Sequence, residues 1–234
     1  MFIMIDGIDG SGKSTIVSAW KKYLSDQGNA IFDLKDFFQE KDCYPEVSEF
    51  KSYDFIFSAE PTYTGMGKVI RQELINHNNN YSPLAIAEAY SLDRLILYTK
   101  NLIPLMEDKK IIIQDRGISS SLAYQTSQNT DITFDSLLAL PGNQLAIQHR
   151  PDHLIIIKTS AAIAAERLTQ RADKQDNSIF EKQNFLEKLE ARFESEEYQN
   201  IFKQRGTQIH YLSGEEKIDI MVAQAIDLLK TILK

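Results

Sequence analysis

Short, almost wholly apolar runs recur along the chain. Three of them lie at 1–5, 111–114 and 154–157, and two further candidates are 53–60 and 208–212. A strand inside a parallel sheet is covered on both faces, so it reads as a continuous apolar run rather than as an alternating pattern. The runs therefore predict a parallel sheet of about five strands.

Between these runs, apolar residues recur every three or four positions, which is the period of a helix with one buried face. One such segment extends from Lys13 to Gly28, a second begins at Pro83 and is expected to stop or kink near Pro104, and a third covers 218–233. Strand and helix patterns thus alternate. We predict an α/β fold of three layers, α/β/α, with the parallel sheet in the middle.

Two stretches fit neither pattern. Residues 33–52 mix charged and aromatic side chains without a stable period, and we interpret them as an insertion. Residues 171–184 are polar and are expected to be mobile. Because no repeat, low-complexity tract or linker divides the chain, we predict a single domain over residues 1–234.

Composition and charge exclude several classes of function. The formal net charge is −7, so a broad nucleic-acid surface is not expected, because neutralising phosphates requires clustered cations in excess. The one cysteine, Cys43, permits neither an internal disulfide nor a thiolate zinc cluster. No apolar run reaches the roughly 18 residues that span a bilayer, and the N-terminus does not resemble a signal peptide. The sequence predicts a soluble, cytoplasmic protein without a membrane partner.

The stretch GIDGSGKST, residues 7–15, matches the P-loop pattern G-x-x-x-x-G-K-[ST] between a strand pattern and a helix pattern. In this motif backbone N–H groups face the phosphates, the lysine reaches the β- and γ-phosphate oxygens, and the serine hydroxyl binds Mg²⁺. The predicted ATP-binding residues are Gly7, Asp9, Gly10, Ser11, Gly12, Lys13, Ser14 and Thr15. A turn that contains a lysine by chance is the alternative, and the flanking patterns argue against it.

A P-loop does not identify the acceptor of the phosphate. Arginines recur where a second phosphate could bind, namely Arg71, Arg94, Arg116, Arg167 and Arg171. Asp115 and Arg116 end a predicted strand, at the edge where open α/β sheets bind ligands. Asp115 is a candidate to orient Mg²⁺ through water, and Arg116 to bind an acceptor phosphate through two hydrogen bonds. A structural ion pair at the strand end is the alternative.

Tyr90 and Arg94 are four residues apart on the long predicted helix and therefore share one face. A stacking ring beside a planar donor suits a nucleobase. The same spacing is more often that of a core aromatic residue beside a solvated arginine, and taken alone it favours this second interpretation.

Several stretches together resemble the thymidylate kinase family. They are FIMIDGIDGSGKST, EPTYTGMGKVIR (60–71), AYSLDR (89–94), DRGISSSLAYQ (115–125), and ERLTQR with FEKQNFLEKLEARF (166–193). They extend over most of the chain, and the combination is more specific than any one part. Members of this family transfer the γ-phosphoryl group of Mg-ATP to the 5′-phosphate of dTMP. The resemblance implies this activity, the P-loop NTPase fold, ATP and dTMP as partners, and a homodimer.

The resemblance also implies roles at the phosphates. Lys13 and Ser14 would hold the donor phosphates and Mg²⁺. Asp9 would lie near the acceptor sugar and phosphate, and Arg116 would bind that phosphate. Arg167 would lie on a lid of about residues 167–184 and serve the transferred phosphoryl group.

A second set of implied roles concerns the nucleoside and the lid. Tyr90 would stack on thymine, Arg94 would reach the base edge and the acceptor phosphate, and Tyr124 would pack at the sugar 2′ position. Ser120, Ser121 and Gln125 match a polar stretch close to the base. Arg171 would be the second lid arginine, in a protein whose P-loop has Gly10 where some members carry arginine.

The sequence departs from the family pattern at several positions. Many bacterial members have arginine before Glu-Pro, whereas Ala59 stands there, and TYTG follows instead of Gly-Gly-Thr. Gly117 replaces an aromatic residue or histidine, and Thr159 and Ser160 stand where an aspartate usually follows the fourth strand. Residues 33–52 are longer than the family's connection. These departures bear on base preference and on the dimer contact.

Two other functions stay open at the level of sequence. Another nucleotide or deoxynucleoside kinase on this scaffold could use a hydroxyl acceptor, and it would need a carboxylate base, for which Glu60 is the candidate. Glu60 is also one of the predicted acceptor-site residues. A P-loop binding module without phosphoryl transfer, with 33–52 as its docking segment, is the third possibility; lid arginines argue against it, since a binder gains little from them.

Overall fold

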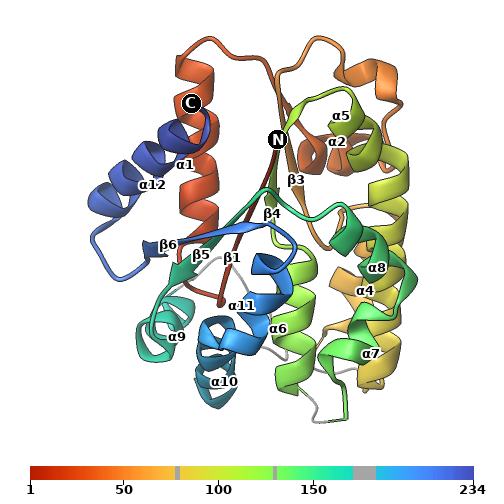
Figure 1. The fold of residues 1–234 in the computed structure, drawn as a ribbon, viewed down its shortest axis with the longest axis vertical. Coiled ribbons are helices and arrows are strands. Elements are labelled where there is room, and N and C mark those ends of the chain that lie inside the picture. Colours follow the sequence, from red (N-terminus) through yellow and green to blue (C-terminus); the bar gives the residue numbers. More distant parts are fainter. Residues whose placement is uncertain (77–79, 129–130, 171–182) are drawn as a thin grey trace.

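The central element is a sheet of parallel strands with helices on both sides (Figure 1). The structure is a computed structural model and describes residues 1–76, 80–128, 131–170 and 183–234. The described strands are β1 (Phe2–Gly7), β2 (Ile31–Asp33), β3 (Phe55–Ala59), β4 (Ile111–Asp115), β5 (His153–Lys158) and β6 (Gln208–Ser213). They pair in the order β2-β3-β4-β1-β5-β6, and every pairing is parallel.

The five apolar runs are all strands, which confirms the predicted α/β class and its parallel sheet. β1 lies in the middle, between β4 and β5, and all six of its residues are buried. The edge strand β2 was not predicted. It has only three residues, each half-buried, so it is too short to produce a periodic signal.

Two helices cover one face of the sheet. They are α1 (Lys13–Asp26) and α12 (Ile218–Ile232), both predicted from their spacing. Trp20 is fully buried between them, and its indole N–H donates to the Ala225 carbonyl oxygen at 2.9 Å. This contact ties the last helix to the helix that follows the P-loop.

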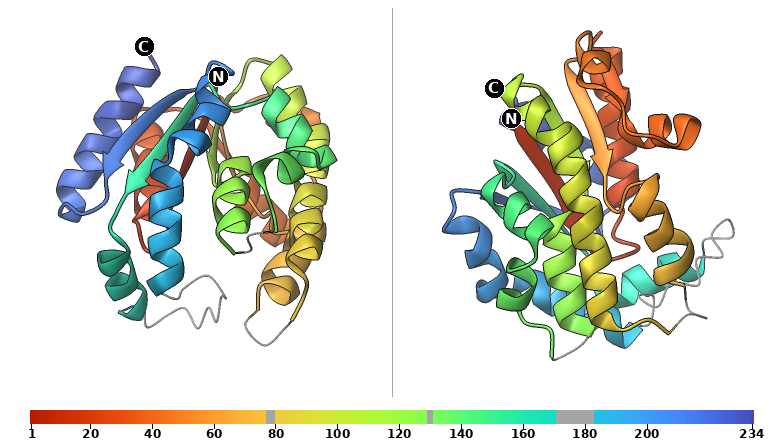
Figure 2. Two further views of the ribbon diagram at one scale, coloured as in Figure 1. Left: turned by 60° about the horizontal axis from the view of Figure 1, so that its bottom comes forward. Right: turned by 90° about the vertical axis from the view of Figure 1, so that its right-hand side faces the viewer.

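The opposite face is covered by a larger group of helices (Figure 2, left). They include α4 (Pro83–Leu97), α5 (Ile103–Glu107), α6 (Ile118–Gln128), α7 (Phe134–Leu138), α8 (Pro141–Gln148), α10 (Gln183–Glu194) and α11 (Glu196–Lys203). Their buried side chains form one apolar cluster with Phe2, Met4, Ile112 and Leu154 of the sheet. The two helical layers and the sheet give the three-layer arrangement expected from the sequence.

The long helix that begins at Pro83 changes its winding before Pro104. A π-helical turn, η3 (Tyr98–Leu102), separates α4 from α5. Proline lacks the N–H that an α-helix needs and clashes with the preceding turn, so a change of winding just ahead of it has a local cause. The side chain of Ser82 accepts from the backbone N–H of Ala85 and begins the helix.

Residues 33–52 form regular structure, although no period was found in their sequence. They contain α2 (Leu34–Lys41), whose buried positions Leu34 and Phe38 are one turn apart, and a short 3₁₀ helix, η1 (Val47–Phe50). The remaining helices are α3 (Gly65–Val69), the π-helical turn η2 (Ile70–Leu74), and α9 (Ala161–Thr169). In the described part of the chain, no helix has the length and apolar character needed to cross a membrane.

Candidate active site

The loop between β1 and α1 has the conformation that its glycines allow. Gly7 and Gly10 have φ of +146° and +81°, a region that side chains rarely adopt. A Cβ atom on Gly7 would lie 2.7 Å from the Ile157 carbonyl oxygen, and one on Gly10 would lie 2.5 Å from the Ala164 carbonyl oxygen. The loop is therefore pressed against β5 and α9, and both positions require glycine.

Lys13 begins α1 with its side chain folded back over the loop. Its ammonium group donates to the carbonyl oxygens of Gly7 at 2.7 Å and Ile8 at 2.8 Å. Burial lowers the pKa of Lys13 to about 8, and the positive charge of Arg116 lowers it further. The negative charges of nearby aspartates oppose this shift. The lysine is thus a buried cation at the mouth of the P-loop.

The predicted metal ligands, Ser14 and Asp115, come from α1 and from the end of β4. The Ser14 side chain is exposed in the first turn of α1, and Thr15 beside it is half-buried. Asp115 ends β4, and its Oδ1 atom is buried without a hydrogen-bond partner among the described residues. In those same residues, no group of three or more His, Cys, Asp or Glu side chains is placed to hold a metal.

Arg116 joins the end of β4 to the P-loop. One of its terminal nitrogens lies 2.5 Å from Oδ1 of Asp9, and the other donates to Oγ of Ser120 at 3.0 Å. The Tyr124 hydroxyl donates to the second carboxylate oxygen of Asp9 at 2.9 Å, and the guanidinium carbon lies 5.0 Å from the centroid of the Tyr124 ring. The structure brings four predicted residues from three chain segments into one polar cluster.

A fifth member of this cluster, Asp6, was missed at the sequence level. It is fully buried, accepts hydrogen bonds from the hydroxyls of Ser119 and Ser120, and lies 3.5 Å from Arg116. Burial raises the pKa of Asp6, against the attraction of Arg116 and Lys13. The sequence contained an indication of this residue, because Asp6 is a single carboxylate at the end of an apolar strand, directly before the P-loop.

Arg94 is completely buried. Its terminal nitrogen lies 2.6 Å from a carboxylate oxygen of Glu60, and the guanidinium also donates to Ser121 Oγ at 2.8 Å and to Asn143 Oδ1. The interpretation as a solvated arginine, which the spacing from Tyr90 favoured, is therefore wrong. The four-residue spacing shows that Tyr90 and Arg94 share one face of α4. It does not show that α6 and α8 pack on that face and bury Arg94.

Glu60 links this second cluster to the first. Burial raises its pKa to about 7, although Arg94 opposes the shift. Its Oε1 accepts from the Gln114 side-chain amide at 2.9 Å, and the same amide donates to the Arg116 carbonyl oxygen at 2.9 Å. Both carboxylate oxygens of Glu60 are thus engaged within the protein.

Arg71 and Tyr90 form a third part of the site. Nε of Arg71 donates to the carbonyl oxygens of Pro61 and Thr62, each at 3.1 Å, and its guanidinium carbon lies 3.8 Å from the centroid of the Tyr63 ring. Burial raises the pKa of Tyr90 to about 12, while the charges of Arg71 and Arg116 act in the opposite direction.

The remaining predicted residues lie at the periphery or outside the described chain. Gln125 is buried on α6, and its Oε1 has no hydrogen-bond partner among the described residues. Arg167 donates to the carbonyl oxygen of Gly214 at 2.6 Å and to that of Gly10 at 3.5 Å, so it docks on the P-loop. Arg171 lies outside the described residues, as do most of the predicted lid positions.

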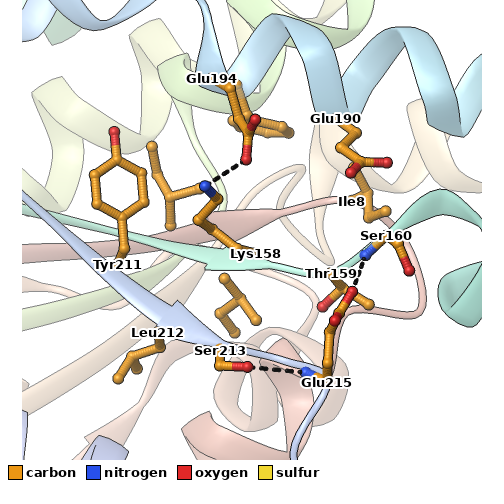
Figure 3. Close-up of a pocket in the computed structure, with 13 residues that line it drawn as sticks. Ile8, Lys158, Thr159, Ser160, Glu190, Glu194, Tyr211, Leu212, Ser213 and Glu215 are labelled. Carbon is orange, nitrogen blue, oxygen red and sulfur yellow. Dashed lines mark hydrogen bonds and ion pairs between the residues drawn. The ribbon is translucent and has the colours of Figure 1, made fainter.

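A pocket of about 330 Å³ opens at the carboxyl ends of β5 and β6 (Figure 3). Inside it Lys158 points to Glu194 at 2.6 Å, and the carboxylates of Glu190 and Glu215 accept backbone N–H groups at the start of α9. None of its described lining residues belongs to the predicted site. The pocket adjoins the P-loop at Ile8 and the start of α9 at Ser160.

Comparisons with known proteins show which family the chain is similar to. The family model "Thymidylate kinase" matches residues 46–225. The chain is 32% identical to a probable thymidylate kinase of Thermococcus onnurineus over 82% of its own length and 85% of the relative. It is 27% identical to a probable thymidylate kinase of Thermococcus kodakarensis over 100% and 98% of the two lengths, and 28% identical to a thymidylate kinase of Mycoplasmopsis pulmonis over 81% and 71%.

The family-model match includes the elements from β3 to β6, and the P-loop lies before it. The sequence similarity and the fold with its P-loop indicate the same family. The chain belongs to the thymidylate kinase family, a family of nucleoside monophosphate kinases.

Proposed function

We propose that the protein transfers the γ-phosphoryl group of ATP to the 5′-phosphate of dTMP, giving dTDP and ADP. The observation that carries this proposal is the contact between Arg116 and Asp9, 2.5 Å apart, in the P-loop whose Lys13 donates to the carbonyl oxygen of the preceding residue, Ile8, at 2.8 Å. A cation for an acceptor phosphate thus adjoins a cation for the donor phosphates. Family membership supports the same reaction.

The acceptor explains why arginines dominate the site. A phosphate monoester has a second pKa near 6, so at neutral pH it is largely a dianion and needs no strong base to become a nucleophile. An oxygen of this dianion attacks the γ-phosphorus, the bond from that phosphorus to the bridging oxygen breaks, and ADP leaves with the electron pair. The protein must align two anions and stabilise spread negative charge. Lys13 and Arg116 meet that requirement.

The residues present fit Mg²⁺ as the companion of ATP. Ser14 offers an exposed hydroxyl in the first turn of α1, and Oδ1 of Asp115, which is buried and has no hydrogen-bond partner among the described residues, would accept from a metal-bound water. When bound, the ion would neutralise charge on the β- and γ-phosphate oxygens. Lys13 and the P-loop backbone would orient the same phosphates.

A hydroxyl acceptor is supported less well. It requires a carboxylate base, and Glu60 has a pKa raised to about 7, which would suit that role. Its oxygens are held by Arg94 at 2.6 Å and by Gln114 at 2.9 Å, however, and the side chain is buried. We therefore assign Glu60 to the orientation of Arg94, beneath the nucleobase, rather than to proton abstraction.

Further roles are proposed for the lid and for assembly. Arg167, held against Gly10 and Gly214, would serve the transferred phosphoryl group together with Arg171. Leu84 and Leu92 on α4, 60% and 43% exposed, supply an apolar stripe for the homodimer that the family resemblance implies. The cytoplasmic location and the absence of nucleic-acid and membrane partners stay predictions.

The test is ADP release by the purified protein with Mg-ATP and, in turn, dTMP, dUMP, dCMP, UMP and thymidine. We expect turnover with dTMP and dTDP as the product. Phosphorylation of thymidine but not of dTMP would favour the deoxynucleoside kinase. Binding of ATP without product from any nucleoside monophosphate would favour a binding module.

A further inference from the structure

Residues 33–52 lie against the loop that follows β3, and this loop carries part of the acceptor site (Figure 2, right). β2 runs parallel to the other strands, and α2 begins directly at its carboxyl end, where the Asp33 side chain accepts from the N–H of Lys35 at 2.9 Å. Open α/β sheets bind ligands beyond the carboxyl ends of their strands. The first turn of α2 is therefore on the ligand-binding side of the sheet.

The end of α2 holds the same loop in place. Asp42, with φ of +50°, accepts from the Thr64 hydroxyl at 3.1 Å and forms an ion pair with Lys68 at 2.8 Å. The Tyr44 hydroxyl lies 3.5 Å from Oγ1 of Thr62. The segment just after α2 is thus attached to the loop through Asp42 and Tyr44.

The start of α2 contributes a cation. Nζ of Lys35 lies 5.2 Å from the centroid of the Tyr63 ring, and the guanidinium carbon of Arg71 lies 3.8 Å from the same centroid. Lys35 is half-buried, and within the described chain neither cation forms an ion pair with a carboxylate. Burial raises the pKa of Asp93 and the charge of Arg71 opposes that shift, so Arg71 has one carboxylate in its surroundings, and that carboxylate accepts from Thr62. Two positive charges against one aromatic ring still form a place for an anionic ligand.

This place adjoins the predicted acceptor. Nε of Arg71 donates to the Pro61 carbonyl oxygen at 3.1 Å, and Pro61 directly follows Glu60, the ion-pair partner of Arg94. The charges of Arg71 and Arg116 also both oppose the rise in the pKa of Tyr90 that burial causes. Ala59, directly before Glu60, adds no charge at the end of β3. The loop after β3 therefore has no cation at position 59, and Lys35 of α2 supplies one close to this loop.

We propose that Lys35 is a binding residue of the acceptor site and, with Arg71, contacts the 5′-phosphate of the acceptor nucleotide. This inference rests on the proposed function and deepens it. It makes residues 33–52 part of the acceptor site, with Asp42 and Tyr44 as positioning residues and Lys35 as the residue that reaches the ligand. The ligand class is a nucleoside 5′-monophosphate, recognised here by its charge and not by its base.

The test compares binding of dTMP and of thymidine, which differ only in the phosphate. For Lys35→Ala, we expect the Kd for dTMP to rise about tenfold, as for loss of one hydrogen bond to a charged group, while the Kd for thymidine and the KM for ATP do not change. Lys35→Arg should recover most of the dTMP affinity. Lys41→Ala is the matched control, because Lys41 is an exposed lysine on the same helix and pairs with its neighbour Glu40.

Each other outcome overturns the assignment. An equal loss for dTMP and thymidine would mean that Lys35 acts by packing Tyr63, and an unchanged dTMP affinity would mean that the cation faces solvent. Circular dichroism of each variant separates misfolding from lost binding. If the wild-type protein binds and turns over dTMP and Lys35→Ala does so equally well, only this inference is refuted. If the wild-type protein is inactive with dTMP, the proposed function is refuted.

Discussion

The guanidinium of Arg116 and the carboxylate of Asp9 are 2.5 Å apart, although 107 positions separate them in the chain. The contact joins the end of β4 to the P-loop, since β4 and β1 are neighbours in the sheet. It places Arg116, the predicted cation for the acceptor phosphate, beside the P-loop, which would bind the donor phosphates. The site therefore depends on the pairing of β1 with β4 as well as on the P-loop motif.

Arg116→Ala should reduce kcat for dTMP phosphorylation by about 100-fold or more, because it removes a positive charge from the region where negative charge is spread in the transition state. Steady-state kinetics measures the effect. Arg150→Ala is the control, since Arg150 contacts the backbone of Arg205 away from the P-loop. A turnover within about threefold of wild type would be incompatible with the role given to Arg116.

Lys13 predicts a pH dependence of ATP binding. With a pKa of about 8, below the usual 10.5, the ammonium loses its proton as pH rises through 8 in the free protein. Bound phosphates favour the charged form, so above pH 8 binding should take up a proton and the affinity for ATP should fall.

Calorimetric titration at pH 9 in two buffers of different ionisation enthalpy measures that proton. Lys13→Arg keeps its charge at this pH, so its binding should show no proton uptake from this position. Identical heats for the wild-type protein in the two buffers would contradict the lowered pKa.

Glu60 predicts a pH dependence of stability. Burial raises its pKa from 4.5 to about 7, so the folded protein retains a proton that the unfolded chain has released in this range. The stabilising contribution is complete below pH 4.5 and is lost as pH rises through 7. Relative to Glu60→Gln, which does not titrate, the free energy of unfolding should fall by roughly 3 kcal/mol over this window. Urea denaturation of both proteins at several pH values measures the difference; parallel curves would exclude it.

The sequence was sufficient for features whose cause is local. The P-loop, the five longer strands and the helices after Lys13 and Pro83 depend on residues close together in the chain, and each was predicted near its observed bounds. β2 has three residues and α2 has eight, so neither has enough positions to show a period.

The candidate site was predicted one residue at a time, whereas its pairings come from tertiary structure. The partners of Arg94 lie 27, 34 and 49 positions away, on α6, at the end of β3 and on α8. No spacing rule relates such positions, and the interpretation of Arg94 as solvated failed for this reason. The contact of Lys35 with Tyr63 belongs to the same class and could not be read from 33–52 alone.

Substitutions of Tyr90 should separate the contribution of its ring to dTMP binding from that of its hydroxyl. Tyr90→Ala should raise the KM for dTMP by about tenfold or more and leave the KM for ATP unchanged, because a stacked base loses its platform. Tyr90→Phe keeps the ring and should stay close to wild type. If the phenylalanine variant is as impaired as the alanine variant, the Tyr90 hydroxyl is the essential group and stacking is not.

Gly10 predicts that the P-loop and α9 move as one unit. A methyl group on Gly10 would meet the Ala164 carbonyl oxygen at 2.5 Å, so Gly10→Ala must push α9, and Arg167 with it, away from the loop. Gly28 is a matched control, because its φ of +83° is nearly that of Gly10 at +81° but nothing lies within 4 Å of its Cβ position. Both variants share the backbone cost of about 1 kcal/mol for a side chain in this conformation. Gly10→Ala should lose about 2 kcal/mol more in free energy of unfolding and should also raise the KM for ATP. Equal stability and equal ATP kinetics for the two variants would show that α9 is not held against the P-loop.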